Sequence, residues 1–340
     1  MLEKYKKYTD DDWRSLAALA RQQSMLAGFY NENFRLVHEN QAFLFRFPKH
    51  NETQFDPRPF READIYKKID GLGLPVPDIF YVAPDQSFMV QQFIDGALID
   101  EVYPPGQKIT KDHIRQIADF YRKIALVDID VSEIMAHDWP RTGPMLTFFE
   151  KMLETSWIVY ENHQKTHGLM FEFLNLPKDP FSAFLTRAAE LTKRPWRLIH
   201  ADIHRKNMIE REDGKLFFID WELALYGDLL RCIAAHLHRS RFFPEEKNQI
   251  ACEIYETLPP EFQKNYMKDL AFYLDFEALG SVITDTVRFP QLLKSGKVSN
   301  TGMYELGVYY ADNLNRISDL MGTKTTTPER ALEWFEQWAI

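Results

Sequence analysis

Polar residues that can support phosphoryl transfer lie together near the middle of the chain. Residues 200–207 read His-Ala-Asp-Ile-His-Arg-Lys-Asn, and an apolar run then leads to Asp220. In a loop of this kind an aspartate, here Asp202, can orient and deprotonate an attacking hydroxyl group. Asn207 and a second aspartate on a following hairpin, Asp220, can hold magnesium against nucleotide phosphates. The spacing therefore predicts a kinase, with Asp202 as the catalytic residue and Asn207 and Asp220 as metal ligands.

The alternation of His200, Asp202 and His204 allows a second interpretation. On a strand these side chains would face one side and could imitate a zinc-hydrolase site. Nothing else favours zinc, because Cys232 and Cys252 are isolated and the sequence contains no His-Glu-x-x-His motif. A third interpretation is an inert polar loop between buried strands, but such a loop does not need these residue types at these intervals. We expect phosphotransferase chemistry, with both histidines shaping the loop by hydrogen bonds.

Composition limits the class of protein. A chain of 340 residues that is 45% hydrophobic can bury one large core or two smaller ones, and we expect two lobes of unequal size. A formal net charge of -9 argues against a nucleic-acid partner. No apolar run is long enough to cross a membrane, and residues 1–7 lack the apolar stretch of a signal peptide. These features predict a cytoplasmic protein with no membrane or nucleic-acid partner.

The segments 198–209 and 219–228 resemble the aminoglycoside phosphotransferase-like family, the small-molecule kinases of the protein-kinase-like fold, which include macrolide and choline kinases. His204, two residues after Asp202, is typical of this branch, and the stretch Ile-Asp-Trp-Glu-Leu-Ala-Leu-Tyr-Gly-Asp at 219–228 is similar to it as well. The resemblance implies a bilobal α+β fold. Residues 1–93 would form a small nucleotide-binding lobe with an antiparallel sheet, and residues 94–340 a larger, mainly helical lobe for catalysis and acceptor binding.

The resemblance assigns Arg46 to the third strand, where the family has a cation that pairs with the alpha and beta phosphates. Apolar residues flank Arg46, so it should be drawn into the fold, where a guanidinium needs an anionic partner. Glu62 is the expected partner, because it shares a helix face with Tyr66 and Ile69. The alternative is a surface acid on a charged helix.

Two further segments are assigned by the resemblance. The stretch 88–96 is similar to the hinge whose main chain reads the adenine edge, with Gln92 and Ile94 supplying the groups. The turn 28–33 corresponds to the turn that covers the triphosphate, although an ordinary asparagine-rich hairpin turn would look the same. Neither segment separates ATP from GTP as the phosphoryl donor.

Some positions depart from the family pattern. Ala201 stands where the family usually has glycine, Ala125 where many relatives have a histidine behind the catalytic loop, and Cys232 where the family has an acid. Together with Arg46 these departures permit a nucleotide-binding pseudoenzyme, whereas the retained catalytic and metal-binding residues favour an enzyme. Glu222, two residues after Asp220, is expected either at the edge of the site or as a solvated surface acid.

The resulting expectation is a magnesium-dependent kinase that moves the gamma-phosphoryl group of ATP or GTP onto a hydroxyl of a small molecule. An aminoglycoside or macrolide is the first acceptor considered, and a metabolite such as choline or a sugar is the alternative. In relatives the C-terminal third builds the acceptor-binding wall, so its acids either bind substrate amino groups or are simply solvated; they are Asp275, Glu277, Asp285 and Asp312. The protein is expected to be a monomer or a homodimer.

Overall fold

The structure is a computed structural model of the chain and describes residues 8–26, 28, 30–49, 58–136 and 138–339. The chain divides into two compact units. Unit 1 comprises Met1–Trp139 and Trp196–Gln263, and unit 2 comprises Pro140–Pro195 and Lys264–Ile340. This division falls elsewhere than the boundary expected between residues 93 and 94, because residues 196–263 form one compact unit with residues 1–139. It does not test how the lobes divide nucleotide and acceptor binding, so that boundary stays a prediction.

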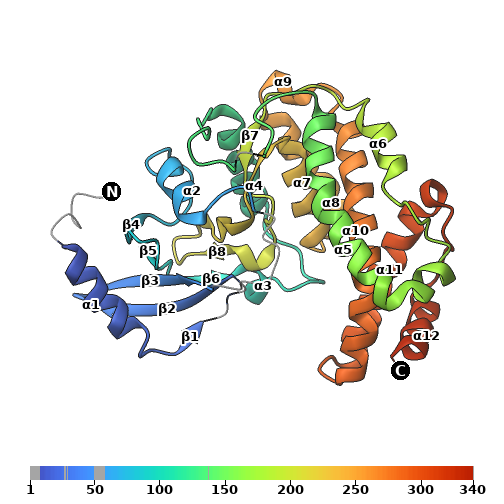
Figure 1. Ribbon diagram of the computed structural model, residues 1–340, viewed down its shortest axis with the longest axis horizontal. Helices are drawn as coiled ribbons and strands as arrows, with labels where there is room; N and C mark the ends of the chain where they lie inside the picture. Colours follow the sequence, from blue (N-terminus) through green and yellow to red (C-terminus); the bar gives the residue numbers. More distant parts are fainter. Residues whose placement is uncertain (1–7, 27, 29, 50–57, 137, 340) are drawn as a thin grey trace. The chain divides into compact units, whose positions relative to one another are not determined.

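An antiparallel sheet of five strands forms the N-terminal part of unit 1, as predicted (Figure 1). Its strand order is β1-β2-β3-β5-β4. The tight hairpin between β2 and β3 turns through Glu39 and Asn40, whose φ angles of 48° and 61° suit the twist of paired strands. The strands are β1 (Met25–Leu26), β2 (Asn31–His38), β3 (Gln41–Pro48), β4 (Ile79–Val82) and β5 (Met89–Gln92).

One helix precedes this sheet in the sequence, and a second lies between β3 and β4. Helix α1 (Asp10–Ala20) begins at Thr9, whose side chain accepts a hydrogen bond from the Asp12 amide. Its apolar face joins aromatic residues of the strands in one buried core that includes Trp13, Phe43 and Phe88. Helix α2 (Glu62–Ile69) buries Glu62 together with Tyr66 and Ile69, the face predicted from their spacing. The sheet and α2 thereby fix the two ends of the Arg46–Glu62 pair.

The remainder of unit 1 holds the catalytic loop between short strands and helices. A three-stranded sheet has the order β6-β8-β9, and β7 pairs with β10. The strands are β6 (Ala97–Leu98), β7 (Arg197–Ile199), β8 (Met208–Glu210), β9 (Leu216–Phe218) and β10 (Leu225–Gly227). The helices are α3 (Ile99–Val102), α4 (Lys111–Leu126), η2 (Arg205–Asn207), η3 (Trp221–Leu223), α7 (Leu229–Arg239), α8 (Pro244–Thr257) and α9 (Pro260–Gln263).

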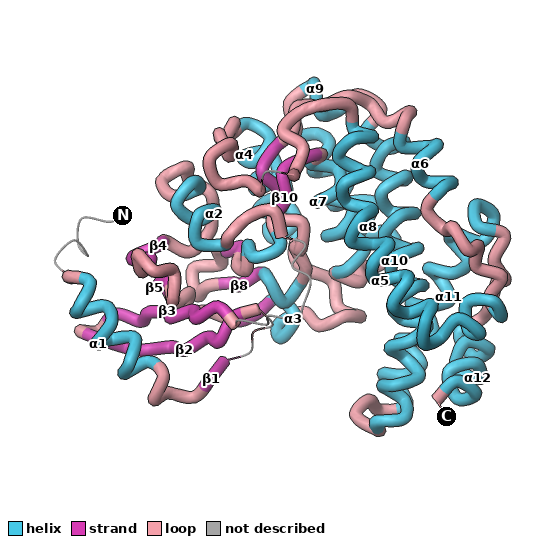
Figure 2. The backbone as a smooth tube through the Cα atoms, viewed as in Figure 1, coloured by secondary structure: helices cyan, strands magenta, loops and turns pink. Residues whose placement is uncertain are grey.

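Unit 2 consists of helices and loops over its described residues, whereas the strands, drawn in magenta in Figure 2, belong to unit 1. A buried ion pair between Arg194 and Asp269, 2.6 Å long, joins the loop before β7 to the first turn of α10. The helices are α5 (Met145–Phe173), α6 (Ser182–Ala188), α10 (Tyr266–Ser295), α11 (Asn300–Met321) and α12 (Pro328–Trp338). Among the described helices of either unit, none is both long and apolar enough to cross a membrane.

Candidate active site

The β8–β9 hairpin brings the two predicted metal ligands to the same end of a short sheet. Met208 pairs with Phe218, and one residue further the Ile219 amide donates a 3.0 Å hydrogen bond to the Asn207 carbonyl. Asn207 therefore precedes one strand and Asp220 follows the other. The apolar residues of the hairpin explain this placement, because Met208 and Phe218 are fully buried and fix the register.

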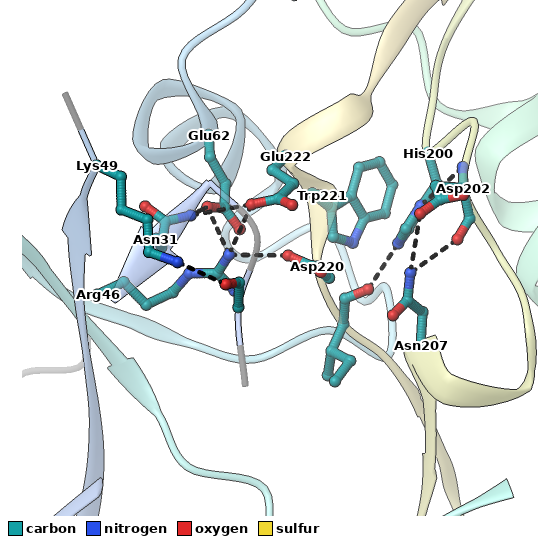
Figure 3. A network of polar contacts seen from close by, with 12 residues as sticks. Asn31, Arg46, Lys49, Glu62, His200, Asp202, Asn207, Asp220, Trp221 and Glu222 are labelled. Atoms are coloured by element: carbon teal, nitrogen blue, oxygen red, sulfur yellow. Dashed lines mark hydrogen bonds and ion pairs between the residues drawn. The ribbon is translucent and has the colours of Figure 1, made fainter. Parts of the chain in front are cut away.

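Asp220 has a left-handed backbone, with φ 68° and ψ 64°. An aspartate tolerates this conformation better than most residues, and such strain persists only where the surrounding structure holds it. Buried Trp221 follows it and packs 4.8 Å from the ring of His200, measured between ring centroids. This backbone turns the Asp220 carboxylate toward Arg46 (Figure 3).

His200 hydrogen-bonds within the catalytic loop, as the sequence predicted. Its Nε2 donates to the Ile219 carbonyl at 2.8 Å, and its Nδ1 accepts from the Asp202 amide at 3.4 Å. Burial lowers the pKa of His200, so the imidazole is neutral and serves as one donor and one acceptor. His204 Nδ1 likewise accepts a hydrogen bond from the Lys206 amide. Both imidazoles thus form hydrogen bonds with main-chain groups of the catalytic loop and the segment after β9.

The Asp202 carboxylate is engaged at both oxygens. Asn207 Nδ2 donates to Asp202 Oδ2 at 3.3 Å and to the Asp202 carbonyl at 2.9 Å, and His204 Nε2 lies 3.7 Å from Oδ2. Arg239 at the end of α7 donates to Oδ1. Burial opposes ionisation, but His204 and the Arg239 charge prevail and lower the pKa of Asp202 to about 2. Asp202 is thus a carboxylate at neutral pH and a weak proton acceptor.

Arg46 lies at the centre of a cluster of three carboxylates (Figure 3). Its Nη2 is 3.0 Å from Glu62 Oε2, which confirms the predicted ion pair. The same nitrogen lies 2.8 Å from Asp220 Oδ1 and 3.3 Å from Glu222 Oε2. Asn31 Nδ2 completes the cluster by donating to both glutamates, at 3.2 and 3.0 Å. Glu222, whose position the sequence left open, is buried here.

One guanidinium does not balance three carboxylates. Burial raises the pKa of Glu62 to about 8, although Arg46 opposes the shift. Burial and the charge of Asp220 raise the pKa of Glu222 to about 7. The three acids offer oxygen atoms within 4.8 Å of one another, a spacing compatible with a shared metal ion. The cluster therefore favours additional positive charge.

The expectation for the turn 28–33 needs a correction. Asn31 to Asn33 belong to strand β2 and pair with residues 46–48 of β3, and the Asn31 side chain enters the carboxylate cluster. Gly28 fits where no side chain would, because a Cβ there would lie 2.5 Å from the Asn31 carbonyl oxygen and 2.4 Å from Asn33 Nδ2. Phe29 lies outside the described residues. Phosphate binding by this turn stays a prediction.

The hinge residues lie where β5 ends. The Gln92 amide donates to the Asp78 carbonyl at 2.8 Å, and Ile94 is buried. Because the Gln92 amide already donates to the Asp78 carbonyl, the predicted adenine contacts reduce to the Gln92 carbonyl and the Ile94 amide. They stay predictions.

A polar connection behind the catalytic loop exists despite the two departures noted at Ala125 and Cys232. The Ala201 amide donates to Cys232 Sγ at 3.4 Å, and Ala201 itself has a left-handed φ of 61°. Burial raises the pKa of Cys232 to about 11, so the thiol is neutral. Next to it, Tyr121 Oη and His236 Nδ1 share a hydrogen bond of 3.0 Å. Neutral groups thus anchor the loop where the family pattern has an acid.

Sequence reasoning missed two arginines of this site. Arg205 is buried inside the catalytic loop and donates to the carbonyls of Tyr103, Gln107 and Ser240, which anchors the loop to two other segments. Arg239, which contacts Asp202, lies 37 residues further along the chain. Arg205 stands between His204 and Lys206, so no local pattern suggests its burial, and none points to Arg239.

The chain belongs to a known family of enzymes. A family model described as "Phosphotransferase enzyme family", abbreviated APH, matches residues 22–260, which include the sheet, the Arg46 cluster and the catalytic loop. The chain is therefore a member of the phosphotransferase enzyme family. A search of curated proteins by sequence found no significant match.

Solved structures confirm the α+β kinase-like fold. An ethanolamine kinase from Plasmodium vivax is 12% identical, with a TM-score of 0.55 over 87% of this chain and 80% of that one. A choline/ethanolamine kinase family protein from Mesorhizobium loti is 15% identical, with a TM-score of 0.52 over 92% of each chain. Aminoglycoside phosphotransferase APH(2'')-Ib with bound ADP is 15% identical, with a TM-score of 0.52 over 90% of this chain and 97% of that one.

Proposed function

We propose that this phosphotransferase is a magnesium-dependent kinase that moves the gamma-phosphoryl group of ATP or GTP onto a hydroxyl group of a small molecule. The observation that carries the proposal is the hairpin geometry, which holds Asn207 and Asp220 together beside a fixed, ionised Asp202. In this proposal residues 1–93 bind the nucleotide, and residues 94–340 supply catalysis and acceptor binding.

In the proposed reaction Asp202 orients the acceptor. The acceptor oxygen forms a bond to the gamma-phosphorus while the bond from that phosphorus to the bridging oxygen breaks, and nucleoside diphosphate leaves. With its pKa held near 2, Asp202 accepts a hydrogen bond from the hydroxyl but takes up its proton only late, when the attacking oxygen has become acidic. Its main contribution is therefore to align the oxygen for in-line attack.

The residues present fit a magnesium ion. The Asn207 side-chain nitrogen is used as a donor to Asp202, which leaves its amide oxygen as the atom able to bind metal. Together with the Asp220 carboxylate it offers the hard oxygen ligands that magnesium prefers. Arg46 already places a positive charge among Asp220 and its neighbours, and one Glu62 oxygen there has no hydrogen-bond partner among the described residues. When bound, magnesium would neutralise phosphate charge during transfer.

Arg46 is proposed to pair with the alpha and beta phosphates, while Glu62 fixes its guanidinium. Main-chain groups of Gln92 and Ile94 are proposed to read the base. Proteins of similar fold support a nucleotide donor, since one is described as bound to ADP and another as a ternary complex with streptomycin and ATP.

Solved structures of similar fold support two classes of acceptor. An aminoglycoside or macrolide was the first expectation from the sequence, and the similar folds include aminoglycoside phosphotransferases. Choline and ethanolamine kinases of similar fold support the metabolite alternative equally. Each class offers a hydroxyl group to a loop of the Asp202 type, so the proposal is a small-molecule kinase with either kind of acceptor.

A comparison of Asp202→Asn with Asp220→Ala tests the proposed roles. We expect Asp202→Asn to lower transfer by at least about 100-fold and to leave the thermal shift with magnesium-ATP intact, because Asp202 acts on the acceptor. Asp220→Ala should abolish the magnesium-dependent shift itself, since a ligand stabilises only the native state that binds it. Thermal shifts with ATP and GTP, each with and without magnesium, measure this.

The exposed variant Glu133→Gln is the control and should behave as wild type. Wild type that shows no magnesium-dependent shift with either nucleotide at millimolar concentration, and no transfer, would contradict the proposed function. Equal and small effects of the two site variants would contradict the assigned roles.

A further inference from the structure

The outer edge of strand β9 is held by groups that the proposed reaction does not use. Strand β9 lies at the edge of its three-stranded sheet, where every second amide points away from the paired strand. The Leu216 amide donates to Gln116 Oε1 at 2.8 Å, and the Phe218 amide donates to the Pro75 carbonyl at 2.8 Å. Asp220 follows two residues after the second of these bonds. The main chain that leads to Asp220 is therefore held from outside the sheet.

Gln116 on α4 binds this edge as a further strand would. Its Oε1 accepts from the Leu216 amide, and its Nε2 donates to the Gly214 carbonyl at 2.9 Å. Nε2 also donates to Asp112 Oδ2 at 2.8 Å, within the same helix. Since the oxygen faces a donor and the nitrogen faces two acceptors, a reversed amide would lose all of these bonds. The glutamine side chain is thus held in one orientation.

The same face of α4 contacts the hairpin on both sides of Gln116. His113, three residues earlier, lies with Nε2 3.1 Å from Glu210 Oε1 at the end of β8. Phe120, four residues later, stacks on Phe218 with a distance of 3.9 Å between ring centroids. Helical residues with these spacings share one face. Gln116 therefore supplies directional hydrogen bonds in the middle of a packed contact between helix and hairpin.

We propose that Gln116 is a positioning residue for Asn207 and Asp220, the two proposed metal ligands. This inference rests on the proposed function and assigns a residue that supports the same site. Beyond Leu216 the ladder continues to Ile219, whose amide donates to the Asn207 carbonyl at 3.0 Å. A displacement of β9 against α4 therefore changes the separation of the two ligands. Because magnesium demands near-ideal octahedral geometry, its affinity is sensitive to such a displacement.

Apolar packing and the ladder alone do not fix the position of β9. Stacking of Phe120 on Phe218 is weakly directional, whereas an amide that both donates and accepts defines a register. Strands β8 and β9 are three residues long each, so few ladder bonds oppose a shift. Arg46 also draws the Asp220 carboxylate toward the carboxylate cluster, at 2.8 Å. An independent hold on the main chain keeps Asp220 in register with Asn207.

Hydrogen exchange of the folded protein tests the positioning role without metal or nucleotide. Gln116→Met removes the hydrogen bonds but keeps the length of the side chain. We expect the Ile219 amide, which Gln116 does not touch, to exchange at least about tenfold faster in this variant, relative to the amides of α7. Exchange at single amides is measured by NMR. Faster exchange confined to Leu216 would overturn the positioning role.

Gln263→Met is the matched control. Gln263 also lies in unit 1, and its Nε2 donates to the carbonyls of Tyr255 and Leu258 at 2.9 and 3.0 Å. The variant therefore loses a comparable pair of bonds between a side chain and the main chain, away from the hairpin. It should leave exchange of the Ile219 amide as in wild type, and equal acceleration in both variants would show a general loss of stability instead of positioning.

Metal affinity tests the consequence for the site. Mn²⁺ serves as the probe because it prefers the same oxygen ligands as Mg²⁺, and electron paramagnetic resonance of the free ion measures its binding at room temperature. In the presence of AMP-PNP, a non-hydrolysable ATP analogue, we expect Gln116→Met to weaken Mn²⁺ binding at least about tenfold. Gln263→Met should match wild type, and Asp220→Ala should abolish binding at the site.

The outcomes separate this inference from the proposed function. Unchanged Mn²⁺ affinity in folded Gln116→Met would overturn the positioning role and leave the proposed function standing. Wild type that binds neither Mn²⁺ nor AMP-PNP would instead overturn the proposed function. If Gln116→Met does not fold, Gln116→Glu supplies the comparison, because it keeps an acceptor for the Leu216 amide but cannot donate to the Gly214 carbonyl.

Discussion

At the scale of single residues, the carboxylates around Arg46 determine how the site responds to protons and cations. Glu62, Asp220 and Glu222 compete for one guanidinium, and Asn31 can donate hydrogen bonds but carries no charge. A buried group of this composition is stabilised by a bound proton or by a metal ion that adds positive charge. The same arrangement therefore links nucleotide-metal binding to pH.

A pH dependence follows from the raised pKa values in this cluster. The pKa of Glu222 rises from an ordinary 4.5 to about 7, and that of Glu62 to about 8, so the folded state binds these protons more tightly than the unfolded state. Their contribution to stability is present below about pH 4.5 and is lost as the pH rises through 7 and 8. Without nucleotide and metal, the melting temperature should fall over that window, and Glu222→Gln should flatten the fall.

Thermal melts between pH 5 and pH 9 measure this dependence. Glu133→Gln, with an exposed side chain, is the matched control and should retain the wild-type slope. A Glu222→Gln profile parallel to that of wild type would show that the glutamate does not take up a proton in this range.

At the scale of elements, short hairpins position the reactive groups. The β8–β9 register fixes Asn207 and Asp220, while the tight β2–β3 hairpin places Asn31 and Arg46 on adjacent strands. Each hairpin owes its register to buried apolar residues on one face, so a shift by one residue would turn the polar side chains away from the site. Helix α7 contributes from its C-terminal end through Arg239.

Substitution of Gly28 tests whether the close packing of this residue against Asn31 and Asn33 constrains the start of strand β2. In Gly28→Ala the new Cβ would collide with the Asn31 carbonyl and the Asn33 side chain, so strand β2 must shift. We expect a loss of about 1–3 kcal/mol in the free energy of unfolding and a weaker thermal shift with magnesium-ATP. Urea titration and thermal melts measure both.

Gly280→Ala is the matched control, because Gly280 lies in α10 with nothing within 4 Å of its added Cβ. It should raise stability by about 0.5–1 kcal/mol, since alanine favours the helix interior. Similar behaviour of the two variants would show that the close approach at Gly28 does not constrain the turn.

At the scale of the whole molecule, chemistry and helical packing reside in different compact units. The residues of the Arg46 cluster and the catalytic loop all lie in unit 1, although they come from segments up to 191 residues apart. Unit 2 has its own buried ion pair, in which Arg194 also donates to the carbonyls of Thr192 and Lys264. Stability and nucleotide binding should therefore separate under mutation.

Arg194→Met should destabilise unit 2 by about 3–5 kcal/mol, because it leaves Asp269 buried without its counter-ion. Lys268→Met removes an exposed pair with Glu190 and should change stability by no more than about 1 kcal/mol. Urea unfolding followed by circular dichroism measures both, and the thermal shift with magnesium-ATP should persist below the transition. A loss of nucleotide binding in folded Arg194→Met would contradict this separation.

Much of the fold and part of the site follow from local patterns in the sequence. The strands and helices around Arg46 and Glu62 were predictable, because alternating or helical spacing shows which face is buried and a buried arginine requires an acid. The interval from Asp202 to Asn207 and Asp220 is likewise local, since it spans one loop and one hairpin. For these residues short-range geometry leaves few alternatives.

Other contacts were decided by the tertiary structure alone. Asn31 meets Glu222 across 191 residues, Arg239 meets Asp202 across 37, and Cys232 supports Ala201 across 31. No periodicity encodes such pairs, because they depend on how separate strands and helices pack. The sequence by itself determined the reactive groups and their local spacing, whereas packing decided which charges surround them, since electrostatic environment depends on distances between segments that sequence order does not constrain.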